Sequence, residues 1–276
     1  MITISELAIY PVKSCGQIKL PQSSIDPFGL QMDRRWMLVD ENGKFLSQRQ
    51  LAKMCLIQPE LIEGGVKLIA SGLKEFRVSV ANLTKTMNVT LWEDSCQALD
   101  CGDEAANTLS TFLGKKCRLV YFHDNEVRQV DPAYARQGDK TAFSDGFPML
   151  LISEASLEDL NQRIKKTNPG YADIEMLRFR PNIVVSGCEP FAEDSWSTIQ
   201  VGDATFNIVK PCSRCVIPSI DPRTAQRGDE PTQTLKTFRR GICGQTDKKL
   251  YFGQNVIASS GLNTQLKVGM PVSVLD

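Results

Sequence analysis

The sequence predicts a mainly β protein of the α+β class, organised as two β-rich units. Short runs of alternating apolar and polar residues recur through the first 120 residues, each bounded by Gly, Asn or Asp. Few segments place apolar residues at helical spacing. The length of 276 residues fits one large or two ordinary domains. A polar stretch near the middle of the chain favours two.

The first unit, residues 1–122, is predicted to be an antiparallel barrel-like or sandwich-like domain. Its first strand is indicated by Ile2, Ile4, Leu7 and Ile9. Further strands are predicted at Trp36–Val39, Val66–Ala70, Glu75–Val80 and Met87–Leu91. One helix interrupts the strands, because apolar residues recur at helical spacing from Asp103 to Leu113 and Gly114 follows.

A polar segment from His123 to Asp145 separates the two units. It contains Pro132 and Gly138 and has no sustained periodicity, which is typical of a linker or long loop. We therefore place the domain boundary near Phe122. The second unit is residues 123–276.

The second unit is predicted to be β-rich with attached helices. After the apolar run Pro148–Ile152, Ser153 can cap a helix whose apolar stripe includes Leu160 and Ile164 and which ends before Pro169. Strands are predicted at Asn182–Ser186, Thr198–Val201, Thr205–Val209, Val256–Ser259 and Val272–Leu275.

Composition limits the classes of partner. Lys and Arg number 32, as do Asp and Glu, so no overall field favours nucleic acid or an anionic membrane. Purely apolar stretches such as Met149–Ile152 are far shorter than the ~20 residues of a membrane-spanning helix. The N-terminus lacks the basic start and apolar core of a signal peptide, so we expect a cytoplasmic protein.

The nine cysteines are expected to be reduced thiols, because their number is odd and no secretory signal is seen. Cys96 and Cys101 have the first spacing of a plant-type iron–sulfur site. Glu104 stands where the next cysteine of that site would be. The pair is therefore predicted to be structural.

Cys212-Ser213-Arg214-Cys215 is the most informative motif, because it places a thiol beside a fixed positive charge. An adjacent guanidinium favours the thiolate, the form that attacks electrophiles and binds soft metals. The motif follows the strand-like run Thr205–Val209, and Pro218 comes soon after it.

The pair has three other interpretations. A structural zinc site needs four ligands, and the chain offers one close cysteine pair and a single histidine, His123. A thioredoxin-type pair would open a helix, whereas Val216, Ile217 and Pro218 favour extended chain and a turn. Two ordinary buried cysteines remain the alternative for the pair taken alone.

Other segments accompany the pair in a fixed order. They are Tyr10-Pro11-Val12-Lys13-Ser14-Cys15, Asp33-Arg34-Arg35-Trp36, Phe179-Arg180-Pro181-Asn182 and Glu193-Asp194-Ser195-Trp196. Together they resemble the MOSC proteins with an N-terminal β-barrel domain, the group of the mitochondrial amidoxime-reducing component and its bacterial relatives. The resemblance runs from about residue 2 through Val268-Gly269-Met270-Pro271-Val272. It implies an N-terminal β-barrel domain and a C-terminal MOSC β-barrel with peripheral helices.

The resemblance implies a molybdenum cofactor, molybdopterin, held between the two units. Cys215 would be the thiolate ligand of the metal, which suits a soft thiolate. The residues implied to bind the rest of the cofactor are Lys13, Ser14, Arg34, Arg180, Asn182, Ser213 and Arg214. Arg35 is the alternative to Arg34, and Cys212 is predicted to be structural.

The segment Ser144-Asp145-Gly146-Phe147-Pro148 resembles a cofactor-lining loop of the same family. Mitochondrial members place hydroxyl residues where this chain has Gly146 and Phe147, so backbone amides are expected to serve there. Asp145 is predicted to be catalytic, orienting an arginine or holding substrate, with an ordinary loop cap as the alternative. His123 is predicted to lie outside the site.

The resemblance implies a two-electron reductase of small N-hydroxylated or N-oxygenated compounds. The cofactor supplies the chemistry and the protein supplies its ligand, orientation and electrostatics. The chain has no dinucleotide fingerprint, so a separate donor is expected, a flavoprotein, a ferredoxin-like protein or a cytochrome b5-like protein. The alternative is a carrier of the cofactor, or of sulfur, without turnover.

Overall fold

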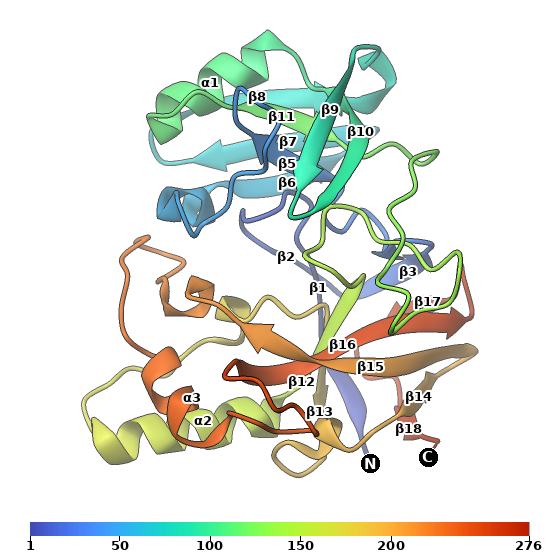
Figure 1. Ribbon diagram of the computed structural model, residues 1–276, viewed down its shortest axis with the longest axis vertical. Coiled ribbons are helices and arrows are strands. Elements are labelled where there is room, and N and C mark those ends of the chain that lie inside the picture. Colours follow the sequence, from blue (N-terminus) through green and yellow to red (C-terminus); the bar gives the residue numbers. More distant parts are fainter. Residues whose placement is uncertain (276) are drawn as a thin grey trace.

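The computed structural model describes residues 1–275 and confirms the mainly β, α+β architecture. Two bodies are stacked along the long axis, and the chain passes between them near its start and again near its middle (Figure 1). None of the helices in residues 1–275 is long and apolar enough to cross a membrane.

The upper body contains two antiparallel sheets and one helix. One sheet has the order β5 (Trp36–Val39), β11 (Arg118–Tyr121), β10 (Asp94–Asp100), β9 (Thr86–Leu91), and the other β6 (Gln58–Ile62), β7 (Gly65–Ala70), β8 (Leu73–Ser79). Helix α1 (Asp103–Leu113) packs on β8 and β11 (Figure 1). Gly114 ends it in the left-handed conformation that glycine adopts readily, as the sequence predicts.

The lower body is organised around an eight-stranded sheet. Its order is β18 (Ser273–Val274), β14 (Thr198–Val201), β15 (Ala204–Arg214), β16 (Leu250–Ser260), β12 (Met149–Ser153), β13 (Ile183–Ser186), β1 (Thr3–Ile9), β2 (Ile18–Leu20). A smaller sheet of β17 (Gln265–Lys267), β3 (Gln22–Asp26) and β4 (Gly29–Leu30) lies beside it. Helices α2 (Glu154–Thr167) and α3 (Thr232–Phe238) lie together at one side (Figure 1).

The N-terminal strands belong to the lower sheet. β1 pairs antiparallel with β13, Leu7 opposite Ile183, and β2 pairs with the other edge of β1. Ile4, Leu7 and Ile9 are fully buried in the lower core. The domain boundary near Phe122 stays a prediction, and the residues before it contribute strands to both bodies.

Strand β15 is longer than predicted and carries the cysteine motif. It begins near the predicted Thr205 but continues through Pro211 to Arg214. The register against β16 shifts on both sides of Pro211, and proline is tolerated at such bulges because it has no N–H to give the ladder. Cys215 thus follows directly after the end of a sheet strand.

A buried polar cluster joins helix α2 to the sheet. Ser153 caps the helix as predicted, its Oγ accepting from the N–H of Ser156 at 3.1 Å. Ser156 Oγ in turn donates to Glu193 Oε1 at 2.7 Å. Glu193 is fully buried, its Oε2 has no hydrogen-bond partner within residues 1–275, and burial raises the pKa of this carboxyl.

Glu193→Gln should gain stability relative to the parent protein as pH rises from 4 to 7. The pKa of Glu193 is higher in the native state than in the unfolded state, where it is about 4.3, so the folded parent protein binds the proton more tightly. The resulting stabilisation of the fold is fully present below the unfolded-state pKa and is lost as pH rises through the native pKa. Glutamine does not titrate, so the difference in free energy of unfolding, measured by urea denaturation, should grow with pH. Glu189→Gln, at an exposed position nearby, is the control. A constant difference would show that Glu193 titrates normally.

Candidate active site

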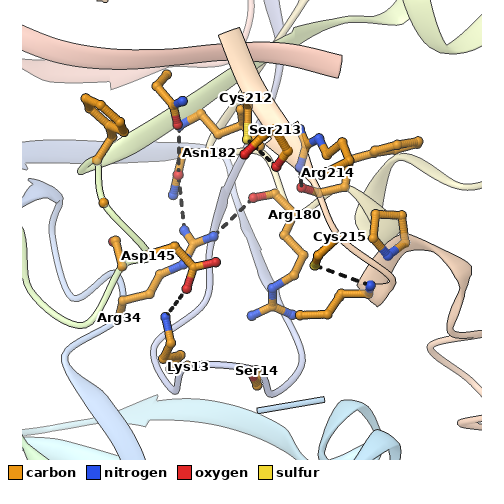
Figure 2. A pocket seen from close by; sticks show the side chains of 18 of the residues that line it. Lys13, Ser14, Arg34, Asp145, Arg180, Asn182, Cys212, Ser213, Arg214 and Cys215 are labelled. Atoms are coloured by element: carbon orange, nitrogen blue, oxygen red, sulfur yellow. Dashed lines mark hydrogen bonds and ion pairs between the residues drawn. The ribbon is translucent and has the colours of Figure 1, made fainter. Parts of the chain in front are cut away.

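A pocket lies between the two bodies, and every site residue predicted from the sequence lines it (Figure 2). One wall contains Lys13 and Ser14, from the loop after β1, and Arg34, from the turn before β5. The remaining predicted residues are Asp145, Arg180, Asn182, Ser213, Arg214 and Cys215. These residues are separated by up to about two hundred positions in the sequence and meet only in the fold.

The pocket carries a large excess of positive charge. Its lining includes the cationic residues Lys13, Arg34, Arg49, Arg178, Arg180 and Arg214. Asp145 is the one carboxylate that lines it within residues 1–275. Because the whole chain has a formal net charge of zero, this local excess indicates an anion-binding site.

Tyr10 holds two of these arginines together. The guanidinium carbons of Arg34 and Arg180 lie 4.3 and 4.2 Å from the centroid of its ring. Arg34 also donates through Nη2 to the carbonyl oxygen of Arg180 at 3.1 Å. The cation–π contacts help to offset the repulsion between the like charges.

Arg34 is fixed further by Asp33 and Asn182. Its Nη1 donates to Asp33 Oδ2 at 2.6 Å and to Asn182 Oδ1 at 3.1 Å. Burial raises the pKa of Asp33, and the adjacent Arg34 opposes that shift. Asn182 is buried, and its side chain also accepts from the N–H of Leu150 and donates to the carbonyl oxygen of Ala8. Asn182, which directly precedes β13, therefore links Arg34 to strands β1 and β12.

Arg180 keeps one donor for a ligand. Its Nη1 donates to the carbonyl oxygen of Cys15 at 2.6 Å. Its Nη2 is buried and has no hydrogen-bond partner among residues 1–275. Burial, with the nearby Arg34, lowers the pKa of Arg180 to about 10, so the group still carries its charge at neutral pH. A buried unpaired cationic N–H is costly and is the expected mark of an anion site.

Three of these residues have strained backbones. Ser14, Arg34 and Arg180 have φ values of +66°, +49° and +60°, in the left-handed region that side chains other than glycine rarely adopt. Such strain costs about 1–3 kcal/mol at each position and persists only where surrounding contacts impose it. Its occurrence three times around one pocket indicates a functional site.

Asp145 is balanced by Lys13 and Arg49. Lys13 Nζ donates to the Asp145 carboxylate and to the carbonyl oxygen of Phe143 at 2.8 Å, and Arg49 Nη2 lies 3.6 Å from Asp145 Oδ2. Burial lowers the pKa of Lys13 to about 8, although Asp145 opposes the shift. Burial favours the neutral form of Asp145, but Lys13 outweighs it and the pKa of the carboxyl falls well below its usual range.

Arg128 shapes the loop that carries Asp145. It is buried and donates to the carbonyl oxygens of Ala142, Ser144 and Asp145 at 2.9, 2.6 and 2.9 Å. It also pairs with Asp94 at 2.7 Å, a residue of β10 in the upper body. The segment predicted to be a linker is therefore irregular but tightly bonded.

The two cysteines of the motif have different surroundings. Cys215 Sγ accepts from the backbone N–H of Ile217 at 3.5 Å. Burial raises the pKa of Cys212, with Arg214 opposing, which favours its neutral thiol. Arg214 itself donates to the carbonyl oxygens of Phe179 and Phe252, so its side chain holds the pocket wall.

Arg34 and Arg35 lie in different surroundings. Arg35 is buried in the upper body, where it donates to the carbonyl oxygen of Phe122 and lies over the ring of Phe28. Arg34 is the one that lines the pocket. His123 does not line it, and its Nδ1 accepts from the N–H of Asn125 at 3.1 Å.

Sequence reasoning did not single out several residues that build the site. They are Tyr10, Asp33, Arg49 and Arg128. Tyr10 and Asp33 stand in the segments that carry the family resemblance, so a signal was present for these two. Arg49 and Arg128 lie in no matched motif, and only the fold places them near Asp145.

Comparison with known proteins confirms the family resemblance over nearly the whole chain. Residues 1–116 match the MOSC N-terminal beta barrel domain, and residues 138–273 match the MOSC domain. The chain is 33% identical to mitochondrial amidoxime-reducing component 1 of Mus musculus over 99% of its length and 82% of the relative. The human protein of that name is also 33% identical, over 99% and 83%.

A second kind of relative is the molybdenum cofactor sulfurase of Danio rerio. The identity is 36% over 95% of this chain, and the match covers 32% of that longer protein. Both kinds of relative match this chain over at least 95% of its length. The chain therefore belongs to the family of MOSC proteins with an N-terminal β-barrel domain, which includes the amidoxime-reducing components.

Proposed function

We propose that this protein is a molybdenum-cofactor-dependent reductase of small N-hydroxylated compounds. The observation that carries the proposal is the meeting of Cys215 with the unpaired buried Nη2 of Arg180 in one cationic pocket. The names of the relatives at 33% identity support the same reaction class.

The residues of the pocket fit the cofactor. A soft thiolate at Cys215 suits molybdenum, and the N–H of Ile217 already points to its sulfur. The cofactor ends in a phosphate, and Arg180 Nη2 is a charged donor with no partner among residues 1–275. Lys13 uses two of its three donors on Phe143 and Asp145, which leaves one for an oxygen.

The remaining predicted residues divide into contact and positioning roles. Ser14 and Ser213 line the pocket and would give hydroxyl contacts to the cofactor. Asn182 and Arg214 have their side chains bonded to Arg34 and to backbone carbonyls, so we propose that they act by holding the cationic groups in place. Arg34 contributes charge beside Arg180.

Reduction of a hydroxylamine to an amine consumes two electrons and two protons and releases water. The bound cofactor supplies the redox chemistry at the metal. Asp145 is proposed to hold the substrate, because its side chain is 58% exposed within the pocket and is kept ionised by Lys13. Its carboxylate accepts an N–H of the substrate and so orients the N–O bond.

Electrons are proposed to come from a separate donor. Candidates by chemistry are a flavoprotein, a ferredoxin-like protein or a cytochrome b5-like protein. The chain shows no dinucleotide-binding glycine motif, so NADH would not serve directly.

A carrier function is the second candidate. The similarity to a molybdenum cofactor sulfurase over 95% of the chain favours it specifically. In this function the same pocket would hold the cofactor and pass it, or its sulfur, to another protein. Turnover with a reductant distinguishes the two functions.

Cys215→Ser should lose molybdenum, whereas Cys212→Ser should largely keep it. Only Cys215 is proposed to bond the metal, and Cys212 is a neutral thiol in the pocket wall. Metal analysis of protein purified from a cofactor-competent host measures the difference. Equal molybdenum in Cys215→Ser and parent protein contradicts the ligand role, and matched melting temperatures show that neither variant has simply unfolded.

Arg180→Ala should weaken cofactor binding by about one to two decades. A charge-assisted hydrogen bond contributes roughly 1.5–3 kcal/mol, and each ~1.4 kcal/mol is tenfold in affinity. Cofactor occupancy at limiting cofactor measures the loss. The matched control is Arg163→Ala on helix α2, far from the pocket lining. Similar occupancy in both variants refutes the anion role of Arg180.

Loaded protein, given electrons from reduced viologen, should convert benzamidoxime to benzamidine. Protein without cofactor should be inactive, and so should loaded protein with NADH alone, because the sequence shows no dinucleotide-binding glycine motif. Chromatographic quantification of benzamidine measures turnover. If loaded protein gives no product under strong reduction but restores an apo-acceptor enzyme, the carrier function replaces the reductase.

A further inference from the structure

Arg49 is a cation of the pocket that the proposed cofactor contacts leave unused. Its guanidinium has one ion-pair contact and one aromatic contact within residues 1–275. The ion-pair contact, from Nη2 to Asp145 Oδ2, is 3.6 Å long and is too long for a hydrogen bond. The side chain is 26% exposed, whereas the unpaired Nη2 of Arg180 is buried. The N–H groups of Arg49 are therefore available to a ligand at the exposed side of the pocket.

The aromatic contact holds the guanidinium in place. Its central carbon lies 4.5 Å from the centroid of the Trp92 ring, a cation–π contact. The Trp92 ring packs in turn on the ring of Phe45, with centroids 4.8 Å apart, and Phe45 is only 5% exposed. A stacked ring covers one face of a guanidinium and leaves the N–H groups, which lie in its plane, free to donate.

Trp92 has an unusual backbone for a tryptophan. It stands in the turn between β9 and β10 with a φ of +58°, in the left-handed region that bulky residues rarely adopt. Its surface is 43% exposed. Strain of this kind is typical of functional sites. The contact with Arg49 connects this strained turn to the pocket.

The backbone of Arg49 is restrained as well. Arg227, which follows Cys215 in the lower body, donates through Nη2 to the carbonyl oxygens of Arg49 and Gln48 at 2.8 and 3.1 Å. The N–H of Arg49 donates to Ser47 Oγ at 3.3 Å. Backbone and side chain are thus both held before a ligand binds, and this preorganisation lowers the entropic cost of binding.

The charges around Arg49 favour an anion. Asp145 is the one carboxylate that lines the pocket within residues 1–275, and Lys13 forms an ion pair with it. Arg49 is a second cation beside the same carboxylate, so one positive charge is uncompensated there. The planar fork of a guanidinium matches the two oxygens of a carboxylate. Under the proposed function the cofactor phosphate binds at Arg180, which leaves Arg49 for an anionic group of the substrate.

We propose that Arg49, positioned by Trp92, is a substrate-binding residue that favours N-hydroxylated compounds bearing a carboxylate. The carboxylate accepts N–H groups of Arg49, while an N–H beside the N–O bond reaches Asp145. This assignment rests on the proposed reductase function. It goes further in giving the compound to be reduced an acidic group, and in making Trp92 a positioning residue.

Two contacts set the expected size of the effect. A hydrogen bond to a charged group contributes about tenfold or more in affinity, and the partial exposure of Arg49 favours the lower figure. An exposed cation–π contact contributes about two- to fivefold. Benzamidoxime and its meta-carboxy derivative share the ring and the reacting group and differ in one charge. Their comparison therefore isolates the contribution of Arg49.

The test measures kcat and KM of loaded protein for both amidoximes, with reduced viologen as donor. Parent protein should have the lower KM for the carboxylated compound, and Arg49→Gln should reduce this preference about tenfold. Arg49→Lys should keep part of it, because the charge remains and the fork is lost. Trp92→Ala should reduce it about two- to fivefold, and Trp92→Phe should restore most of it. Arg77→Gln, at an exposed arginine of β8 beside Glu75, is the matched control.

A binding measurement separates this inference from the proposed reaction. Titration of oxidised, loaded protein with benzamidine and with meta-carboxybenzamidine needs no turnover. Arg49→Gln should remove the preference for the carboxylated ligand. If neither amidoxime is reduced but binding shows this loss, the reductase proposal fails and the role of Arg49 stands.

Three results would overturn the inference. The first is a parent protein that prefers neither compound, which needs no variant to establish. The second is an unchanged preference in Arg49→Gln with a normal melting temperature. The third is a loss of molybdenum in Arg49→Gln, which would make Arg49 a contact of the cofactor. If Arg49→Gln does not fold, Arg49→Lys and Trp92→Ala decide by the same measurements.

Discussion

Two like-charged side chains, Arg34 and Arg180, stand over one tyrosine ring, and the rest of the pocket depends on the contacts that keep them there. Guanidinium groups this close repel each other, and the repulsion grows as water is removed. Tyr10 offers a π face to both, and Asp33 offers a buried carboxylate to Arg34. Arg34 comes from the turn that leads from β4 of the lower body to β5 of the upper body, and Arg180 comes from the segment before β13 of the lower body.

The strained backbones at Ser14, Arg34 and Arg180 follow from this arrangement. Each residue stands outside the strands, in a loop or turn whose surrounding contacts hold the left-handed φ. β1 and β13 are neighbours in the sheet, and the segments that contain Ser14 and Arg180 adjoin their ends. The backbone strain lowers stability at the pocket, and the apolar side chains buried in the core of the lower body compensate for it.

Local patterns in the sequence predicted what depends on local structure. Helix α1 with Gly114, the Ser153 cap of α2 and the strands β5 and β14 follow from periodicity and capping residues alone. The members of the site came from resemblance to a family. Neither source revealed that Arg34 bonds to a residue 148 positions later, or that Arg128 holds the loop of Asp145. Such pairings are decided by topology, and periodicity carries no information about which distant strand ends become neighbours.

The positive charges of the pocket are unequally compensated. Lys13 and Arg49 stand beside the Asp145 carboxylate, and Lys13 forms an ion pair with it. Arg180 and Arg34 have only the buried Asp33 against two positive charges, and Arg180 Nη2 has no hydrogen-bond partner among residues 1–275, so an anion is favoured there. Under the proposed function, the phosphate of the cofactor would bind at these two arginines. The exposed part of the Asp145 carboxylate would then be left for the compound to be reduced.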